Sequence, residues 1–132
     1  MKWEQKLLVG IKQFDDQHKE LIRIISELRN SKNSGESKIY LKSLLFELIS
    51  YTKYHFTAEE RMMEKHNYPY FNDHRLEHEK LTEQVENYLE QYSVGKSSLD
   101  EKVFEFLKEW LFDHIMVTDK NMGDYLYKRG LR

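Results

Sequence analysis

The sequence predicts an all-α protein, folded as an up-down-up-down antiparallel four-helix bundle with an N-terminal arm and a short C-terminal helical turn. Two observations predict this fold. Apolar residues recur at spacings of three and four over four segments of the chain, which is the period of amphipathic helices. Short turns containing Gly, Ser, Asn or Pro join these segments, and short connections make successive helices antiparallel. We expect one domain covering residues 1–132.

The N-terminal arm, residues 1–12, is apolar without a clean helical period, so we expect it to pack against the bundle. Its apolar residues are Trp3, Leu7, Leu8, Val9 and Ile11. Asp15 or Asp16 is the expected N-cap of the first helix, because a short acidic side chain accepts a hydrogen bond from an unpaired backbone N–H. The run Asn30-Ser-Lys-Asn-Ser-Gly35 is expected to end this helix.

Three further helices follow the same apolar period. The expected ranges are about residues 36–65 for the second helix, 70–92 for the third and 98–123 for the fourth. Asn67-Tyr68-Pro69 forms the turn after the second helix, and Ser98 is the expected cap of the fourth. Gly123 is expected to close the fourth helix, leaving residues 124–128 as the short terminal turn.

Composition excludes several classes of protein. The chain has a formal net charge of -2 with 21 basic and 23 acidic side chains, and no basic block that would indicate nucleic acid or a membrane surface. It has no cysteine, which excludes disulfides, thiolate zinc sites and iron–sulfur clusters. No apolar run approaches the roughly 20 residues that span a bilayer. We therefore expect a cytoplasmic protein without membrane insertion.

Histidines and carboxylates occur at helical spacing in a pattern typical of a metal site. His55 and Glu59 are four residues apart, as are His74 and His78, so each pair lies on one helix face. His18 precedes them, and His114 and Asp119 follow. In an up-down-up-down bundle all of these positions fall at the same end. Burying two carboxylates without positive charge costs several kcal/mol each, which favours a metal centre over a purely structural cluster.

Other motifs are weaker. His74-Arg-Leu-Glu77-His78 matches the H-x-x-E-H pattern of inverted zinc proteases, but Glu77 is expected to face away from the bundle core. The run Gly95-Lys96-Ser97 lacks the first glycine of a phosphate-binding loop. His66 is expected to end the second helix rather than to bind metal.

The pattern of a lone His followed by H-x-x-x-E, H-x-x-x-H and H-x-x-x-x-D resembles the hemerythrin family, in particular the single-domain bacteriohemerythrins. All seven positions are filled, and the segment from Val9-Gly-Ile11 to His18 is similar to the family's N-terminal arm. The resemblance implies a hemerythrin-like di-iron domain. It assigns His74, His78 and His114 to one iron ion, His18 and His55 to the other, and Glu59 and Asp119 as bridges.

By the same resemblance the cofactor is a pair of iron ions with an oxo or hydroxo bridge, and the ligand is dioxygen. One iron then has six ligands, whereas the iron held by His18 and His55 has five and one vacancy, where dioxygen is expected to bind. Bulky residues beside the histidines are expected to form the oxygen pocket and exclude water. They are Leu21, Phe56, Trp110, Leu111 and Ile115.

The spacing of His114 and Asp119 does not fit a regular helix. Five residues at about 100° each turn the second side chain roughly 140° away from the first. Both must reach one metal pair, so we expect a wide π-type turn between them, as is found at functional sites.

Three classes of function fit these residues. The first is a binding protein for reversible dioxygen carriage, storage or delivery, with an oxygen-consuming enzyme as a candidate recipient. The second is an enzyme on the same scaffold, such as a di-iron oxidase, a peroxidase or a protein handling nitric oxide. The third is a sensor module, which we place below the others because no signalling domain follows Arg132. We expect the first class, and not an enzyme.

Overall fold

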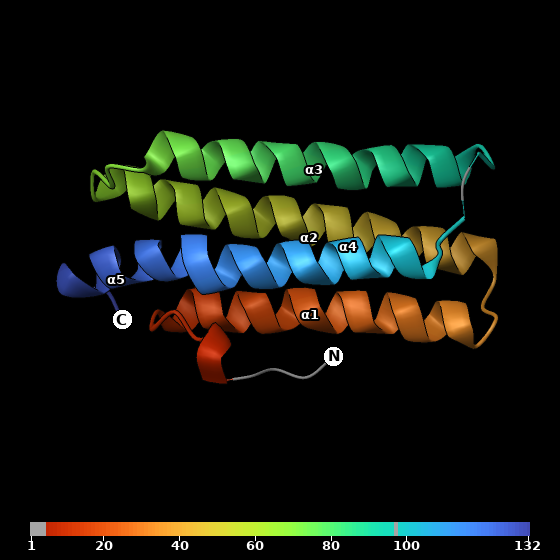
Figure 1. The fold of residues 1–132 in the computed structure, drawn as a ribbon, viewed down its shortest axis with the longest axis horizontal. Helices are drawn as coiled ribbons and strands as arrows, with labels where there is room; N and C mark the ends of the chain where they lie inside the picture. Colours follow the sequence, from red (N-terminus) through yellow and green to blue (C-terminus); the bar gives the residue numbers. More distant parts are fainter. Residues whose placement is uncertain (1–4, 97) are drawn as a thin grey trace.

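The computed structural model describes residues 5–96 and 98–132, and it shows an antiparallel four-helix bundle (Figure 1). The helices are α1 (Lys12–Asn33), α2 (Lys38–Lys65), α3 (Phe71–Ser93) and α4 (Glu101–Asp113), the last continuing through η2 (His114–Asp119) into α5 (Lys120–Lys128). A short 3-10 turn, η1 (Gln5–Leu7), precedes α1. The described residues contain no strand. The predicted fold class is confirmed.

The N-terminal arm packs on the bundle, as expected. Leu7, Val9 and Ile11 are each at most 5% exposed, whereas Trp3 lies outside the described residues. The predicted cap of the first helix is wrong, because α1 already begins at Lys12. Asp15 instead accepts hydrogen bonds from the backbone N–H groups of the arm, at 2.7 Å from Val9 and 3.3 Å from Gly10. Its carboxylate therefore fastens the arm to the first turn of α1.

The turn between α2 and α3 is fixed by local backbone geometry and by a contact from the far end of the chain. Asn67 adopts a positive φ of 55°, which reverses the chain after the C-cap residue His66. The phenol of Tyr125 in α5 donates a hydrogen bond to the carbonyl of His66 at 2.7 Å and lies 3.1 Å from that of Asn67. This contact holds the end of α5 against the turn.

The cap of α4 is Asp100 and not Ser98, so that prediction is wrong. The Asp100 carboxylate accepts a hydrogen bond from the backbone N–H of Val103 at 3.2 Å. Leu99 directly precedes the cap and is only 2% exposed. Phe104, the fourth residue after the cap, is only 4% exposed. Burial of this pair fixes the angle at which the chain enters the helix, and so places Asp100 at the cap.

Gly123 does not close a helix, contrary to expectation, but lies inside α5 with a helical backbone. The predicted terminal turn, residues 124–128, is the last part of that same helix. A Cβ atom on Gly123 would lie 2.5 Å from the carbonyl oxygen of Val9 and 3.0 Å from its Cβ. The absence of a side chain therefore lets the arm cross α5 closely.

We predict that Gly123→Ala destabilises the protein by about 1–3 kcal/mol, because the contact it creates is with backbone and cannot be relieved by a rotamer change. The higher helix propensity of alanine offsets up to about 1 kcal/mol of this cost. Urea unfolding of the variant measures the effect, with Asp124→Ala on the exposed side of α5 as the control. A Gly123→Ala protein as stable as the parent would contradict the close packing of the arm.

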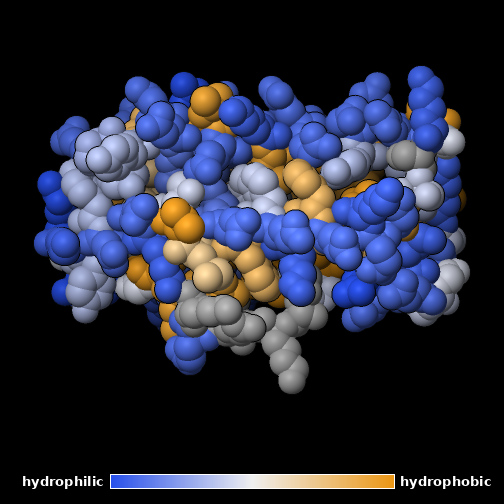
Figure 2. Space-filling view, viewed as in Figure 1, coloured by the Kyte–Doolittle hydropathy of each residue, from blue (hydrophilic) through white to orange (hydrophobic). Residues whose placement is uncertain are grey.

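The surface is mostly hydrophilic on the face shown in Figure 2. The core is a column of aliphatic and aromatic side chains contributed by all of the long helices. No helix among the described residues is long and apolar enough to cross a membrane.

Candidate metal centre

Seven buried polar side chains meet at one end of the bundle. They are His18 of α1, His55 and Glu59 of α2, His74 and His78 of α3, and His114 and Asp119 of η2. Each is at most 4% exposed. The structure thus brings together all of the residues that the sequence pattern indicated as metal ligands. Their role as ligands stays a prediction.

All five histidines present the same ring nitrogen, Nε2, to the centre of the cluster. His18 Nε2 lies 3.0 Å from Asp119 Oδ2 and 3.3 Å from Glu59 Oε2, and His55 Nε2 lies 3.1 Å from the same Glu59 oxygen. On the other side, His74 Nε2 lies 3.2 Å from Glu59 Oε1.

The remaining two histidines complete this second side. The Nε2 atoms of His78 and His114 are 3.1 Å apart, and they lie 3.0 Å from Glu59 Oε1 and 3.1 Å from Asp119 Oδ1, respectively. Donor atoms about 2.1 Å from one ion and at right angles to each other are separated by about 3.0 Å. The spacing therefore fits donors that share an ion.

The donor atoms form two overlapping groups. One contains His18 and His55, the other contains His74, His78 and His114, and both include Glu59 and Asp119. Within each group the donor atoms all lie within 4.8 Å of one another. Each carboxylate thus has one oxygen directed toward each group, which is the arrangement needed to bridge two cations.

The expected wide turn between His114 and Asp119 is confirmed. The backbone from His114 to Asp119 is a π-helix, inserted between the regular helices α4 and α5. Hydrogen bonds that span five residues bring side chains at this spacing onto one face. The turn therefore lets His114 and Asp119 point into the same cluster.

Electrostatic coupling within the cluster is strong. Burial alone would raise the pKa of Glu59, but the neighbouring His55 and hydrogen bonds from histidines outweigh it, so that the pKa lies well below its ordinary value. The pKa of Asp119 is likewise well below its ordinary value, because His114 and His18 outweigh burial and the nearby Glu59 charge. Both side chains are therefore carboxylates at neutral pH, as metal bridging requires.

The pKa values of most of the histidines whose shift is given move the other way, upward. Burial lowers the pKa of His18, but the carboxylates of Asp119 and Glu59, 3.0 Å and 3.3 Å from its Nε2, raise it to about 9. The same balance raises the pKa of His74 to about 9, and attraction to Asp119 raises that of His114 to about 10. His55 differs, because burial dominates and lowers its pKa. Without a metal, the carboxylates thus hold protons on most of these rings.

Two of the histidines have a hydrogen-bond partner for the outer nitrogen, Nδ1. His55 Nδ1 donates to Gln17 Oε1 at 2.6 Å, and His78 Nδ1 donates to Glu60 Oε2 at 2.9 Å. A ligating histidine usually donates its second N–H in this way, which fixes the ring and its tautomer. Sequence analysis missed Gln17 and Glu60, although each immediately precedes or follows an expected ligand.

Glu77 lies near the outer nitrogen of a third histidine, His114, but beyond hydrogen-bond distance. Its Oε2 lies 3.6 Å from Nδ1 of His114, and His114 lowers the pKa of Glu77. Its side chain is 47% exposed at the edge of the cluster, consistent with the expectation that it faces away from the core. Its contact is therefore with the outer edge of an expected ligand, where it can orient the ring.

Buried polar atoms without a hydrogen-bond partner also fit a metal. Among the described residues, both carboxylate oxygens of Asp119, Nδ1 of His18, His74 and His114, and Oγ of Ser26 are in this state. A buried carboxylate that accepts no hydrogen bond is costly unless a cation compensates its charge. The donor set, nitrogen with carboxylate oxygen and no sulfur, suits iron among the transition metals.

Aromatic rings cover the cluster on the side of the bundle core. Phe56 stacks on His78 with ring centroids 3.7 Å apart, and Trp110 stacks on His114 with centroids 4.5 Å apart. Beneath them is a small cavity of about 20 Å³. It is lined by Leu21, Ile25, Leu48, Thr52, Phe56, Leu81, Val85, Leu107, Trp110 and Leu111.

The position of this cavity follows from the topology. Leu21, Leu81 and Leu111 each lie three residues from an expected ligand on their own helix, toward the middle of the bundle. Four of the five residues expected to form an oxygen pocket line the cavity. Ile115, the fifth, is fully buried but is not part of the lining. The space is about the size of one small molecule and its walls are almost entirely apolar.

The family pattern described as "Hemerythrin HHE cation binding domain" matches residues 9–126. The chain belongs to the hemerythrin family. It is 31% identical over 122 residues to a bacteriohemerythrin of Pseudomonas aeruginosa, which covers 92% of this chain and 78% of that relative. It is 30% identical over 112 residues to the bacteriohemerythrin of Methylococcus capsulatus, which covers 85% of each chain.

A solved structure leads to the same family. The chain superimposes on a crystal structure of wild-type hemerythrin with a TM-score of 0.90, at 28% identity and over 96% of this chain and 97% of that one. The resemblance inferred from the ligand pattern is therefore confirmed at the level of family and fold. Membership of this family and the buried His, Glu and Asp cluster fit a metal-binding hemerythrin.

Proposed function

We propose that this hemerythrin binds dioxygen reversibly at a di-iron centre, for oxygen carriage, storage or delivery. The observation that carries the proposal is the pair of overlapping donor groups that share Glu59 and Asp119. His74, His78 and His114 would hold one iron ion, and His18 and His55 the other. An iron pair held by these residues, with an oxo or hydroxo bridge, would supply the electrons that reversible oxygen binding requires.

The chain's own residues favour binding over turnover. The side of the cluster with His18 and His55 has only two nitrogen donors, which leaves room there for a small ligand. The adjoining cavity has room for a diatomic molecule and none for an organic substrate. Phe56, Trp110 and Leu111 give it apolar walls, and an apolar site that excludes water suppresses proton leakage and side reactions. A binding protein therefore fits this cavity better than an oxidase or peroxidase does.

The test is optical. Spectra of the ferrous protein are expected to change when oxygen is added and to return when it is removed, without consumption of a reductant. Continuous oxygen uptake in the presence of a reductant, with no reversible spectrum, would favour the enzyme class instead. A cytoplasmic location stays a prediction, and the candidate recipient, an oxygen-consuming enzyme, has no support in the described residues.

We predict a metal content of about two iron ions per chain, since the donor atoms form two groups and not one. Metal analysis of the purified protein, alongside a protein concentration from amino-acid analysis, measures the ratio. A content of about one zinc ion per chain, held by His74 and His78 alone, would instead support the protease-like pattern.

We predict that Leu111→Ala speeds the irreversible oxidation of the oxygenated protein, because the truncated side chain opens the cavity to water. The empty space left by the missing side-chain atoms should also lower the free energy of unfolding by about 2–5 kcal/mol. Leu45→Ala is the matched control, since Leu45 is fully buried in α2 but does not line the cavity. It should destabilise the protein similarly and leave the oxidation rate unchanged. Equal oxidation rates in both variants would remove Leu111 from the proposed role.

A further inference from the structure

The two donor groups differ in the charge of the residues behind their histidines. In the three-histidine group (His74, His78 and His114), Nδ1 of His78 has a carboxylate as its partner, Oε2 of Glu60 at 2.9 Å. In the two-histidine group (His18 and His55), Nδ1 of His55 has a neutral amide instead, Oε1 of Gln17 at 2.6 Å. The outer partner is therefore charged in one group and uncharged in the other.

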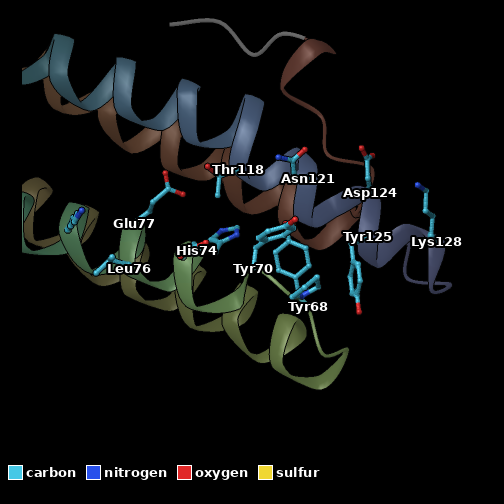
Figure 3. A pocket seen from close by; sticks show the side chains of 13 residues that line it. Tyr68, Tyr70, His74, Leu76, Glu77, Thr118, Asn121, Asp124, Tyr125 and Lys128 are labelled. Carbon is cyan, nitrogen blue, oxygen red and sulfur yellow. The ribbon is translucent and has the colours of Figure 1, made fainter.

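Glu77 places a second carboxylate behind the three-histidine group. Figure 3 shows its side chain extending from α3 toward η2, beside Thr118. Its Oε2 lies 3.6 Å from Nδ1 of His114, too far for a hydrogen bond but close enough for electrostatic attraction. In the described part of the chain, the carboxylate contacts of His18 and His55 all involve Nε2, the inner nitrogen. No acidic side chain thus stands behind either ring of the two-histidine group.

The charge of an outer partner changes how strongly a histidine ring binds a cation. A carboxylate that accepts the Nδ1–H hydrogen bond draws the hydrogen toward itself, which leaves more negative charge on the ring and makes Nε2 the more basic ligand. The carboxylate charge also attracts a cation on the far side of the ring. An amide oxygen accepts the same hydrogen bond and fixes the ring, but it contributes no net charge.

We propose that Glu60 and Gln17 are positioning residues that make the two metal sites unequal, so that the three-histidine group takes up a first cation tightly and the two-histidine group a second one more weakly. The number of nitrogen donors already favours this order, and the outer partners add to it. The side with room for a small ligand is then also the side that loses its metal first. This inference rests on the proposed metal centre and extends it from the ligands to the residues behind them.

The experiment titrates metal-free protein with zinc, a diamagnetic probe that binds histidine and carboxylate ligands. Competition with a chelator of known affinity gives the two stepwise dissociation constants. Nitrogen NMR of histidine-labelled protein shows which Nε2 atoms bind at each step. We expect the Nε2 resonances of the three-histidine group to shift with the first equivalent of zinc and those of the two-histidine group with the second. Protein that binds neither zinc nor ferrous iron would reject the proposed function and this inference together.

Glu60→Gln removes the charge behind His78 but keeps an oxygen that accepts the hydrogen bond. It should weaken the first step about tenfold, the lower end of the range for an outer partner of a metal ligand, and leave the second step unchanged. Glu60→Ala removes the hydrogen bond as well and should weaken the first step further, up to about a hundredfold. Glu64→Gln is the matched control, since it removes the same charge from the exposed face of α2 and should change neither step.

Gln17→Glu tests the converse, because it places a carboxylate behind His55. It should strengthen the second step about tenfold and leave the first unchanged. The Glu60→Gln, Gln17→Glu double variant keeps the net charge of the chain and should bring the two dissociation constants closer together by about a hundredfold. Circular dichroism checks the folding of each variant. Gln17 is buried, so if its variant does not fold, the variants at the partly exposed Glu60 still decide the question.

Two results would overturn the proposal in protein that binds two zinc ions. One is a first step that Glu60→Gln leaves unchanged, since Glu60 would then only orient the ring of His78. The other is equal weakening of both steps by Glu60→Gln, since the charge would then act on the cluster as a whole. Either result would leave the proposed function standing, because the protein would still hold both ions.

Discussion

Replacing Glu59 with glutamine is expected to reduce the metal content from about two ions per chain to one or none, because Glu59 belongs to both donor groups. Glutamine keeps the shape of the side chain but supplies only one carbonyl oxygen, without charge. Each ion would then lose a negative ligand. Metal analysis and the iron-dependent optical spectrum of the variant measure this loss.

The same substitution is expected to destabilise the metal-free protein by about 3–5 kcal/mol, the typical cost of leaving a buried charge unpaired. His18 and His74 both lie within 3.3 Å of the Glu59 carboxylate, which helps to raise their pKa values. Without it, these rings lose one of the two carboxylates that keep them charged, the other being Asp119. Urea unfolding of the metal-free variant tests this part separately from metal loading.

Glu64→Gln is the matched control, since Glu64 lies on the exposed face of the same helix. It should leave the metal content unchanged. The free energy of unfolding should stay within about 0.5 kcal/mol of that of the parent. A Glu59→Gln protein that still holds both ions would show that Asp119 alone can bridge them. The proposed role of Glu59 would then be wrong.

The sequence predicted the fold and the meeting of the seven polar side chains because both depend on short-range rules. Four-residue spacing places His55 with Glu59 on one face whatever the rest of the chain does. The topology follows from short turns, and it brings the helix ends together. Even the π-helix was predictable, since a five-residue spacing between His114 and Asp119 conflicts with a regular helix.

The predictions for Asp15 and Gly123 were wrong because the role of each residue is set by a part of the chain outside its own helix. Asp15 has the composition of a helix cap, but it accepts hydrogen bonds from the arm at Val9 and Gly10. Gly123 resembles a helix end, but its real constraint is the backbone of Val9, more than a hundred residues earlier. Neither contact leaves a trace in the local sequence pattern.

The partners of the outer histidine nitrogens were missed for a related reason. Which nitrogen of a ring faces inward depends on its rotamer, and periodicity gives only the direction of the Cβ atom. Gln17 and Glu60 lie next to expected ligands in sequence, and so appeared to point to other faces of their helices. Long side chains reach around the helix, and both end within 2.9 Å of a ring nitrogen.

The stability of the metal-free protein is expected to fall steeply as the pH rises from about 7 to 10. The folded state raises the pKa of His18 and His74 to about 9 and that of His114 to about 10, against an ordinary value of 6.5. Groups with a raised pKa contribute stability that is fully present below pH 6.5 and lost as the pH rises through 9 and 10. His55 contributes in the opposite sense, because burial lowers its pKa.

Acid is expected to destabilise the same protein through its carboxylates. Glu59 and Asp119 have depressed pKa values, so their contribution is present above their ordinary values near 4 and is lost as the pH falls further. The metal-free protein should therefore be most stable at about pH 5–6.5. Thermal unfolding followed by circular dichroism across pH 3–10 measures the whole profile.

Metal should remove the alkaline limb of this profile. A ligating histidine is neutral, so once iron or zinc occupies the Nε2 atoms no ring proton is left to lose between about pH 7 and 10. The metal-loaded protein is thus expected to keep its unfolding temperature over the interval in which the metal-free protein loses it. Parallel decline of both forms would place the titrating groups outside the cluster. A flat profile for the metal-free protein would show that its histidines are already neutral at pH 7, and that the carboxylates do not hold protons on them.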